Sequence, residues 1–265
     1  EEDIWSNITN TCHCIDNDND QVIYHDNDFE VFIDPDSNNH YYKEFEMNSY
    51  NSTWDLLLNK PYSDGGYENS TRVYGNEGFD MQPPLICSVY VNGTINNPEG
   101  LKDNYWTVEI AIPLEKLAYM ENITLPPNNN TFWRINFSRV EWNTIIQNNT
   151  YIKQPSCQSC PIPGTEAEDN WVWSPQGEIN MHAPDKWGML QFVNLPSNKY
   201  SSSSYITNPE WPIRSLAMIL YYAQRDYYSV NGYYTSNINE LDKYTKNYIF
   251  STMECSFLPE ITLQN

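Results

Sequence analysis

Carboxylate, amide and guanidinium groups recur at every second position in four short segments, residues 28–34, 42–48, 106–112 and 133–138. Successive side chains leave a β-strand on opposite faces, so this alternation predicts four half-buried strands with these groups on one face. Such groups can hydrogen-bond the hydroxyls of a sugar, and their oxygens can hold a hard cation. The residues predicted to share this face are Glu30, Glu44, Glu46, Asn48, Glu109, Arg134 and Asn136. A sheet surface that simply faces water is the alternative interpretation.

The remaining positions of the same segments are apolar and predict the side of the strands that packs in a core. They are Phe29, Val31, Ile33, Phe45, Met47, Val108, Ile110, Ile135 and Phe137.

Two acidic turns place oxygen ligands at alternate positions, as calcium-binding loops do. The candidate ligands are Asp34, Asp36 and Asn38 in the turn after the first strand, and Asp16, Asp18 and Asp20 upstream of it. The upstream run lacks the Gly and the later Glu of an EF-hand loop. A solvated acidic turn without an ion is the alternative in both places.

The cysteine count is even, as a disulfide framework requires, although six cysteines allow 15 connectivities. The six are Cys12, Cys14, Cys87, Cys157, Cys160 and Cys255. We expect one bridge to hold the C-terminal tail through Cys255, with Cys87 as its partner. The spacings of Cys12 with Cys14 and of Cys157 with Cys160 leave a zinc site open as an alternative.

N-glycosylation triplets favour an oxidising, extracellular location over zinc. The predicted acceptors are Asn7, Asn51, Asn69, Asn92, Asn122, Asn129 and Asn148. An eighth triplet begins at Asn136, which we do not expect to be modified because it lies within a strand pattern. Chance predicts roughly five triplets in a sequence so rich in Asn, so the excess is modest.

The charge balance excludes two classes of partner. The sequence has 35 Asp and Glu against 14 Lys and Arg, a net charge of −21. Nucleic acid and anionic membrane surfaces would be repelled. No stretch approaches the roughly 18–20 apolar residues of a membrane span. The sequence begins without Met or a signal peptide, as a mature form or a fragment would.

The sequence changes character near residue 195. Residues 1–195 are β-rich and end in a predicted strand at 187–192, and residues 196–207 form a polar linker. Residues 208–265 contain an amphipathic helix at 209–230, with Asn208 as its N-cap and Gly232 at its end. The tail at 245–265 has the pattern of one or two short strands. This amphipathic helix is expected to pack on the sandwich or on a neighbouring subunit.

Five segments carry a family resemblance: YHDNDFEVFIDPD (24–36), YYKEFEMNSYNSTWDLLLNKPY (41–62), WTVEIAIP (106–113), WRINFSRVEW (133–142) and EDNWVWSPQGEINMHAPDKWGMLQF (168–192). Together they closely resemble the family 9-like carbohydrate-binding proteins, which are related to family 9 carbohydrate-binding modules and DOMON-type β-sandwiches. The match runs through about residues 20–192, and residues 211–241 resemble the C-terminal helical extension of such proteins. The resemblance implies a mostly β protein, an antiparallel β-sandwich of the jelly-roll or Ig-like type. It also implies sugar binding, often structural calcium, and no catalytic machinery.

The same resemblance points to tryptophans as sugar-stacking platforms. In family 9 modules two tryptophans clamp the sugar, and Trp173 or Trp171 corresponds by segment to one of them, with Trp54 as a guess for the other. Burial in the core is the alternative for each ring. A glycosidase pair among the strand carboxylates is disfavoured, because carboxylates in number on one sheet face usually bind calcium or hydroxyls.

Two functions therefore remain open. The first is a secreted, non-catalytic glycan-binding protein. The second is a structural subunit of a glycosylated extracellular fibre or coat, a homo-oligomer or filament. The second possibility follows from the resemblance, since members of the family usually have several strands before the segment that begins here at Trp5. Open sheet edges or chain termini would then make the contacts between subunits.

Overall fold

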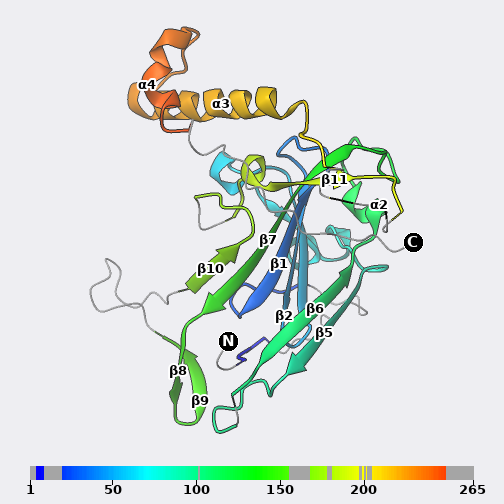
Figure 1. Ribbon diagram of the computed structural model, residues 1–265. Coiled ribbons are helices and arrows are strands. Elements are labelled where there is room, and N and C mark those ends of the chain that lie inside the picture. The colour runs from blue at the N-terminus through cyan, green and yellow to red at the C-terminus, as the bar shows by residue number, and fades with distance from the viewer. Residues whose placement is uncertain are drawn as a thin grey trace.

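The protein is an antiparallel β-sandwich with a long C-terminal helix (Figure 1). The computed structural model describes residues 4–8, 20–100, 102–154, 168–177, 181–196, 199, 201 and 205–248. Within these residues, no helix is long and apolar enough to cross a membrane.

The larger layer is a seven-stranded sheet with the strand order β10-β7-β1-β2-β3-β4, and β11 also pairs with β7. Every pairing in it is antiparallel. The strands are β1 (Asp28–Asp34), β2 (Tyr42–Asn48), β3 (Thr53–Leu58), β4 (Glu68–Asn69), β7 (Thr131–Trp142), β10 (Glu168–Val172) and β11 (Gly188–Phe192). β7 is long enough to pair with β11 through its first half and with β10 through its second half.

The second layer is the hairpin of β5 (Ile86–Asn92) and β6 (Tyr105–Ala111), which packs on one face of the large sheet. We call this side the apolar face; it carries Phe29, Val31, Phe45 and Met47. All nine apolar residues predicted from the alternating pattern belong to the core between the two layers, which confirms that expectation. A smaller hairpin of β8 (Thr144–Gln147) and β9 (Thr150–Lys153) follows β7.

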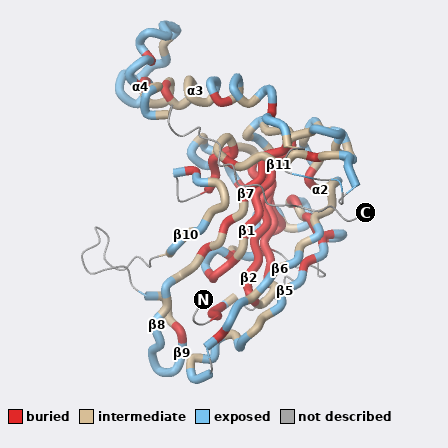
Figure 2. Tube along the Cα trace, viewed as in Figure 1, coloured by how far each residue is buried: buried red, intermediate tan, exposed pale blue. Residues whose placement is uncertain are grey.

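The opposite side of the sheet, the carboxylate face, carries Asp28, Glu30, Glu44 and Glu46 and is also covered. A second core forms there around Phe32, and the covering residues come from irregular segments at 4–8, 20–27 and 181–187. All seven residues of β2 are buried as a result. Figure 2 shows β1 and β2 as buried strands through the centre of the molecule.

Residues 4–8, the N-terminal strap, tie the two layers together. Asp26 Oδ2 accepts hydrogen bonds from Ser6 Oγ (2.5 Å) and from the backbone N–H groups of Asn7 (2.9 Å) and Ile8 (2.8 Å). At its other end, the backbone N–H of Ile4 donates to Asp103 Oδ2 (2.6 Å), which precedes β6. In a β-strand these backbone N–H groups would donate to a neighbouring strand. Here two buried carboxylates accept their hydrogen bonds instead.

Short helical turns connect the strands: α1 (Thr71–Tyr74), α2 (Leu114–Leu117), η1 (Tyr62–Asp64), η2 (Gly75–Glu77) and η3 (Pro184–Lys186). The C-terminal part comprises α3 (Trp211–Asn231), η6 (Ile238–Glu240) and α4 (Asp242–Thr245). The predicted helix is present and ends as expected at Gly232, whose φ of 78° is left-handed. It starts two residues later than predicted, because the Asn208 side chain accepts the Glu210 N–H (3.0 Å) in a turn that precedes the helix.

Polar contacts hold α3 against one end of the sandwich. Arg225 Nη1 lies 2.6 Å from Asp64 Oδ1, and the guanidinium of Arg134 lies 4.0 Å from the centroid of the Trp211 ring. Residues 242–245 form α4, and residues 246–248, the described start of the predicted tail, form a turn and not a strand. The rest of the tail, 249–265, lies outside the described residues.

Candidate functional site

The large sheet brings most of the predicted oxygen-rich residues together, but in the interior. Glu30, Glu44, Glu46, Asn48, Arg134 and Asn136 share the carboxylate face, and each is at most 5% exposed. Glu109 does not belong to this group, because it lies on the outer, exposed side of the β5–β6 hairpin. The expectation of one shared, open surface is therefore wrong. Alternation identifies which side chains share a face, but it does not reveal what covers that face.

Arg134 and Asn136 already hold neighbouring segments in place. Arg134 Nη1 donates to the backbone carbonyl of Trp187 (2.6 Å), and burial lowers the pKa of Arg134 to about 10. Asn136 exchanges two hydrogen bonds with the backbone of Ser174, at 3.1 and 2.8 Å. These two side chains fix the segments around Ser174 and Trp187 over the carboxylate face.

Burial changes the acid–base chemistry of the carboxylates. Burial raises the pKa of Glu30 to about 7, and it raises the pKa values of Asp28, Glu44 and Glu46 well above their usual range. His182 offers no compensating charge, although its Nε2 lies 3.7 Å from Glu44 Oε2. Burial lowers the pKa of His182 to about 3, so its imidazole is neutral at pH 7.

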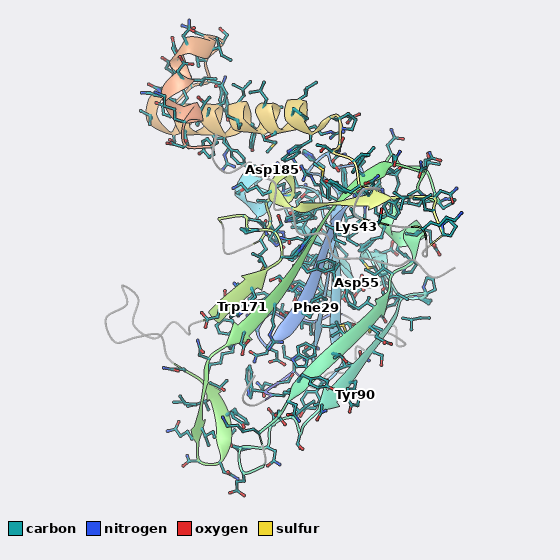
Figure 3. The ribbon with its side chains drawn as sticks, in the orientation of Figure 1. Phe29, Lys43, Asp55, Tyr90, Trp171 and Asp185 are labelled. Atoms are coloured by element: carbon teal, nitrogen blue, oxygen red, sulfur yellow. The ribbon has the colours of Figure 1, made fainter. Side chains whose placement is uncertain are left out.

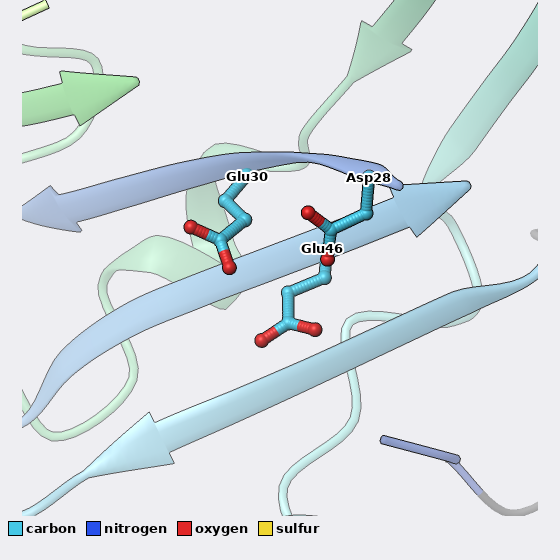
Figure 4. A group of neighbouring side chains, drawn as sticks. All are labelled: Asp28, Glu30 and Glu46. Atoms are coloured by element: carbon cyan, nitrogen blue, oxygen red, sulfur yellow. The ribbon is translucent and has the colours of Figure 1, made fainter. Parts of the chain in front are cut away.

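Asp28, Glu30 and Glu46 form the tightest group on this face, which we call the acidic trio. One carboxylate oxygen from each lies within 4.8 Å of the other two. Figure 4 shows the three carboxyl groups of β1 and β2 directed to the same side of the sheet. Glu30 faces Glu46 directly in the strand register. Glu46 Oε2 accepts the backbone N–H of Tyr24 (2.9 Å), which belongs to the covering segment.

A second group forms at the other end of β1, around the first predicted calcium turn. Asp34, Asp36 and Glu121 also bring carboxylate oxygens within 4.8 Å of one another. Lys43 Nζ lies 2.7 Å from Glu121 Oε1, and both side chains are fully buried. We call these four residues the lysine-paired cluster.

Calcium binding by the triad predicted from this turn, Asp34, Asp36 and Asn38, stays a prediction. Asn38 contacts the cluster through Asp36. Its Nδ2 donates to Asp36 Oδ2 (2.7 Å), and its Oδ1 accepts the N–H of His40 (2.7 Å). The Lys43 ammonium already lies beside Glu121 in this cluster, so a calcium ion here would have to bind close to a positive charge.

Asp20, from the upstream acidic run, is buried and fully engaged. Its carboxylate accepts the Thr71 hydroxyl (2.6 Å) and the backbone N–H groups of Thr71 (3.2 Å) and Asp55 (3.1 Å). It fastens the segment before β1 to β3 and α1, instead of facing a solvated loop. Asp16 and Asp18 lie outside the described residues.

The three candidate tryptophans occupy different environments. Trp54 is 5% exposed in the second core, and Trp173 is half-buried against the first. Trp171 is 67% exposed. It lies across from Arg139 in the β10–β7 register, and therefore on the apolar-face side of the sheet, not beside the acidic trio.

Polar residues that the sequence analysis did not identify surround Trp171. We call this group the Trp171 patch; it consists of Asp169, Trp171, Arg139, Glu141 and Asn143. Arg139 Nε lies 3.2 Å from Glu141 Oε2, and Asn143 Nδ2 donates to Asp169 Oδ2 (3.1 Å). The pattern of β7 contained a signal for it, because after Phe137 the apolar positions of the alternation become Arg139 and Glu141. The Arg139 guanidinium lies 5.3 Å from the centroid of the Trp106 ring on β6.

The structure describes only some of the cysteines and asparagines that were predicted to be modified. Cys87 lies in the first core, and the other five cysteines are outside the described residues, so the disulfide framework and its zinc alternative stay predictions. Asn7, Asn122, Asn129 and Asn148 are exposed; Asn51, Asn69 and Asn92 are partly so. Asn136 is fully buried.

A surface pocket of about 230 Å³ lies where α3 approaches the sandwich. Its walls include Asp36, Asn130, Phe132 and Arg214. None of the candidate tryptophans lines it.

Comparison with known proteins adds little to this geometry. No family model matches the chain, and no curated protein does. Among solved structures, a candidate carbohydrate-binding protein of Bacteroides uniformis ATCC 8492 is similar, with 17% sequence identity and a TM-score of 0.38. The similarity covers 68% of this chain and 66% of that one. Membership of the family 9-like proteins therefore stays a prediction.

Proposed function

We propose that this protein is a non-catalytic, carbohydrate-binding β-sandwich that holds its ligand at the Trp171 patch. The observation that carries the proposal is the 67% exposure of Trp171 among charged and amide side chains. An exposed indole provides a flat apolar plane on which a pyranose ring can stack. The neighbouring Arg139, Asp169 and Asn143 offer both donors and acceptors for sugar hydroxyls.

The chemistry of the patch favours neutral glycans. Arg139 is its single cationic side chain and is paired with Glu141, and the protein as a whole carries a net charge of −21. Sulfated and uronate-rich glycans would be repelled by such a surface. The ligand that we propose is therefore a neutral oligosaccharide or polysaccharide.

Binding to an array of neutral and anionic glycans tests this proposal. Trp171→Ala should lower the affinity for the best neutral glycan at least tenfold, because the stacking plane is lost. Tyr90→Ala is the matched control, since Tyr90 is 60% exposed on β5, in the other layer of the sandwich (Figure 3). Unchanged binding by the Trp171 variant would refute the site, and equal losses in both variants would show non-specific adhesion.

Assembly is a second candidate, because β10 is an edge strand of the large sheet and presents Trp171. An exposed edge can accept a strand from a second copy. Sedimentation of the wild type and the Trp171→Ala variant separates the two functions. Concentration-dependent oligomers that only the wild type forms, without glycan binding, would favour the structural-subunit function.

We also propose an extracellular location, supported by the exposure of Asn7, Asn122, Asn129 and Asn148. Attachment of a glycan needs an acceptor asparagine that an enzyme can reach, which buried Asn136 does not provide. Intact mass before and after glycosidase treatment of the protein from its native source is the test. An unchanged mass would remove this support.

A further inference from the structure

We propose that the acidic trio is a binding site for one calcium ion inside the sandwich. Asp28, Glu30 and Glu46 come from the adjacent strands β1 and β2 and are 0%, 3% and 2% exposed. The proposed cation would lie between the sheet and its covering segment 20–27. It is distinct from the acidic turns that the sequence predicted as calcium ligands.

The first argument is that two oxygens of this buried group lack a partner. Asp28 Oδ2 and Glu30 Oε2 are inaccessible to solvent and accept no well-formed hydrogen bond from a described residue. A contact from the Ser138 hydroxyl offsets only part of the rise in the pKa of Glu30. Buried carboxylate oxygens in folded proteins almost always have a donor or a metal ion. The orphaned oxygens belong to two of the three side chains that converge in Figure 4.

The second argument is that no described cation pairs directly with the trio. The positive charge of Arg139, which pairs with Glu141, offsets only part of the rise in the pKa of Asp28. No described lysine or arginine forms an ion pair with a member of the trio. Glu44 and Glu168 add further negative charge nearby. The lysine-paired cluster, built from a similar set of carboxylates, shows how this protein neutralises such a group elsewhere.

The third argument concerns the kind of ion. The trio offers only oxygen ligands, which select hard cations and not zinc or copper. Its three ligand oxygens all lie within 4.8 Å of one another, close enough for a single cation to contact them together. Magnesium requires short bonds of about 2.1 Å and retains several waters, which suits a buried site poorly.

Terbium luminescence provides a direct test, because Trp54 faces Glu46 across the β2–β3 pair and can sensitise a bound lanthanide. After chelation and dialysis, the full chain should show saturable terbium emission on tryptophan excitation, and calcium should displace the terbium. Glu30→Gln and Asp28→Asn preserve side-chain shape and should each weaken calcium binding at least tenfold. Trp54→Phe should reduce the emission while calcium still raises the Tm.

Two control variants locate the ion. Glu121→Gln removes a carboxylate from the lysine-paired cluster, and Glu109→Gln removes an exposed one from the hairpin. Both should bind calcium as the wild type does. The proposal is overturned if Glu30→Gln binds calcium with unchanged affinity, if only Glu121→Gln loses binding, or if calcium fails to raise the Tm of the wild type.

Discussion

The two ends of strand β1 carry similar groups of buried carboxylates, but the negative charge of the two groups is balanced differently. At one end Lys43 enters the group and pairs with Glu121 at 2.7 Å. At the other end no described lysine or arginine forms an ion pair with the acidic trio. Both groups keep two buried oxygens without a donor, which are Asp28 Oδ2 and Glu30 Oε2 in the trio and Asp34 Oδ1 and Glu121 Oε2 in the lysine-paired cluster. Removing a charge from water costs several kcal/mol, which an opposite charge can offset and which uptake of a proton can avoid. The contrast is one reason for the proposal that the trio binds an ion, whereas a lysine already pairs within the other group.

The largest effect on the unfolding free energy should come from removing the lysine of the lysine-paired cluster. Lys43→Met leaves the Glu121 carboxylate buried without its ammonium partner, which typically costs about 3–5 kcal/mol in unfolding free energy. Urea denaturation measures this loss. Adding Glu121→Leu should recover most of it, since a buried pair replaced by apolar groups is often neutral. A double variant as unstable as the single one would contradict this account.

A substitution in the acidic trio should change the unfolding free energy in the opposite direction. In the presence of a chelator, Glu30→Gln should increase the unfolding free energy by about 1–3 kcal/mol, because it removes an unpaired buried charge. With calcium in excess the order should reverse, and the wild type should be the more stable protein. A variant that is less stable than the wild type under both conditions would show that Glu30 has a packing role only.

Asp20 and Asp55 are a further buried acidic group, and their effect on stability should depend on pH. Burial raises the pKa of Asp20 to about 6, from 3.8 in the unfolded chain, and raises that of Asp55 well above its usual range. The folded state therefore holds protons more tightly, and its stability falls as pH rises from about 4 towards 6 and above. Asp55→Asn should reduce that fall and add about 1–2 kcal/mol at pH 8, with little change at pH 4. The asparagine can still accept the Met81 N–H that Asp55 Oδ1 accepts at 2.8 Å.

The smallest effect on stability should come from the exposed patch. Trp171→Ala is expected to change the unfolding free energy by less than about 0.5 kcal/mol, since the ring is mostly in solvent. Thermal unfolding of the variant checks this. A loss above 2 kcal/mol would mean that the ring packs in the core, and it would undermine any glycan-binding experiment that used the variant.

Local sequence pattern was sufficient for strands β1, β2, β6, β7 and β11 and for the first core. Phe29, Val31 and Phe45 alternate with polar residues, and this period depends only on the geometry of an extended chain. The end of α3 at Gly232 was equally local, because a left-handed residue stops a helix without help from the rest of the fold.

The candidate site could not be predicted in the same way, because its features depend on contacts between distant segments. The segment with Tyr24 covers the carboxylate face without any periodicity that would reveal it. Glu109 has the right spacing but belongs to a separate hairpin, which only the strand pairing decides. Trp171 and Trp173 share a face as expected, yet the register with Arg139 places that face on the opposite side of the sheet from the carboxylates.

The N-terminal strap has a consequence for the order in which the molecule forms. The N–H of Ile4 finds its acceptor 99 residues later, at Asp103, and Ser6 contacts Asn96, which is 90 residues away. During synthesis, the strap therefore leaves the ribosome before these acceptors and has to wait until the loop between β5 and β6 has also emerged. Closing so long a loop is entropically unfavourable before the intervening strands have paired. The strap should thus be among the last parts to dock, and the first to detach when the protein begins to unfold.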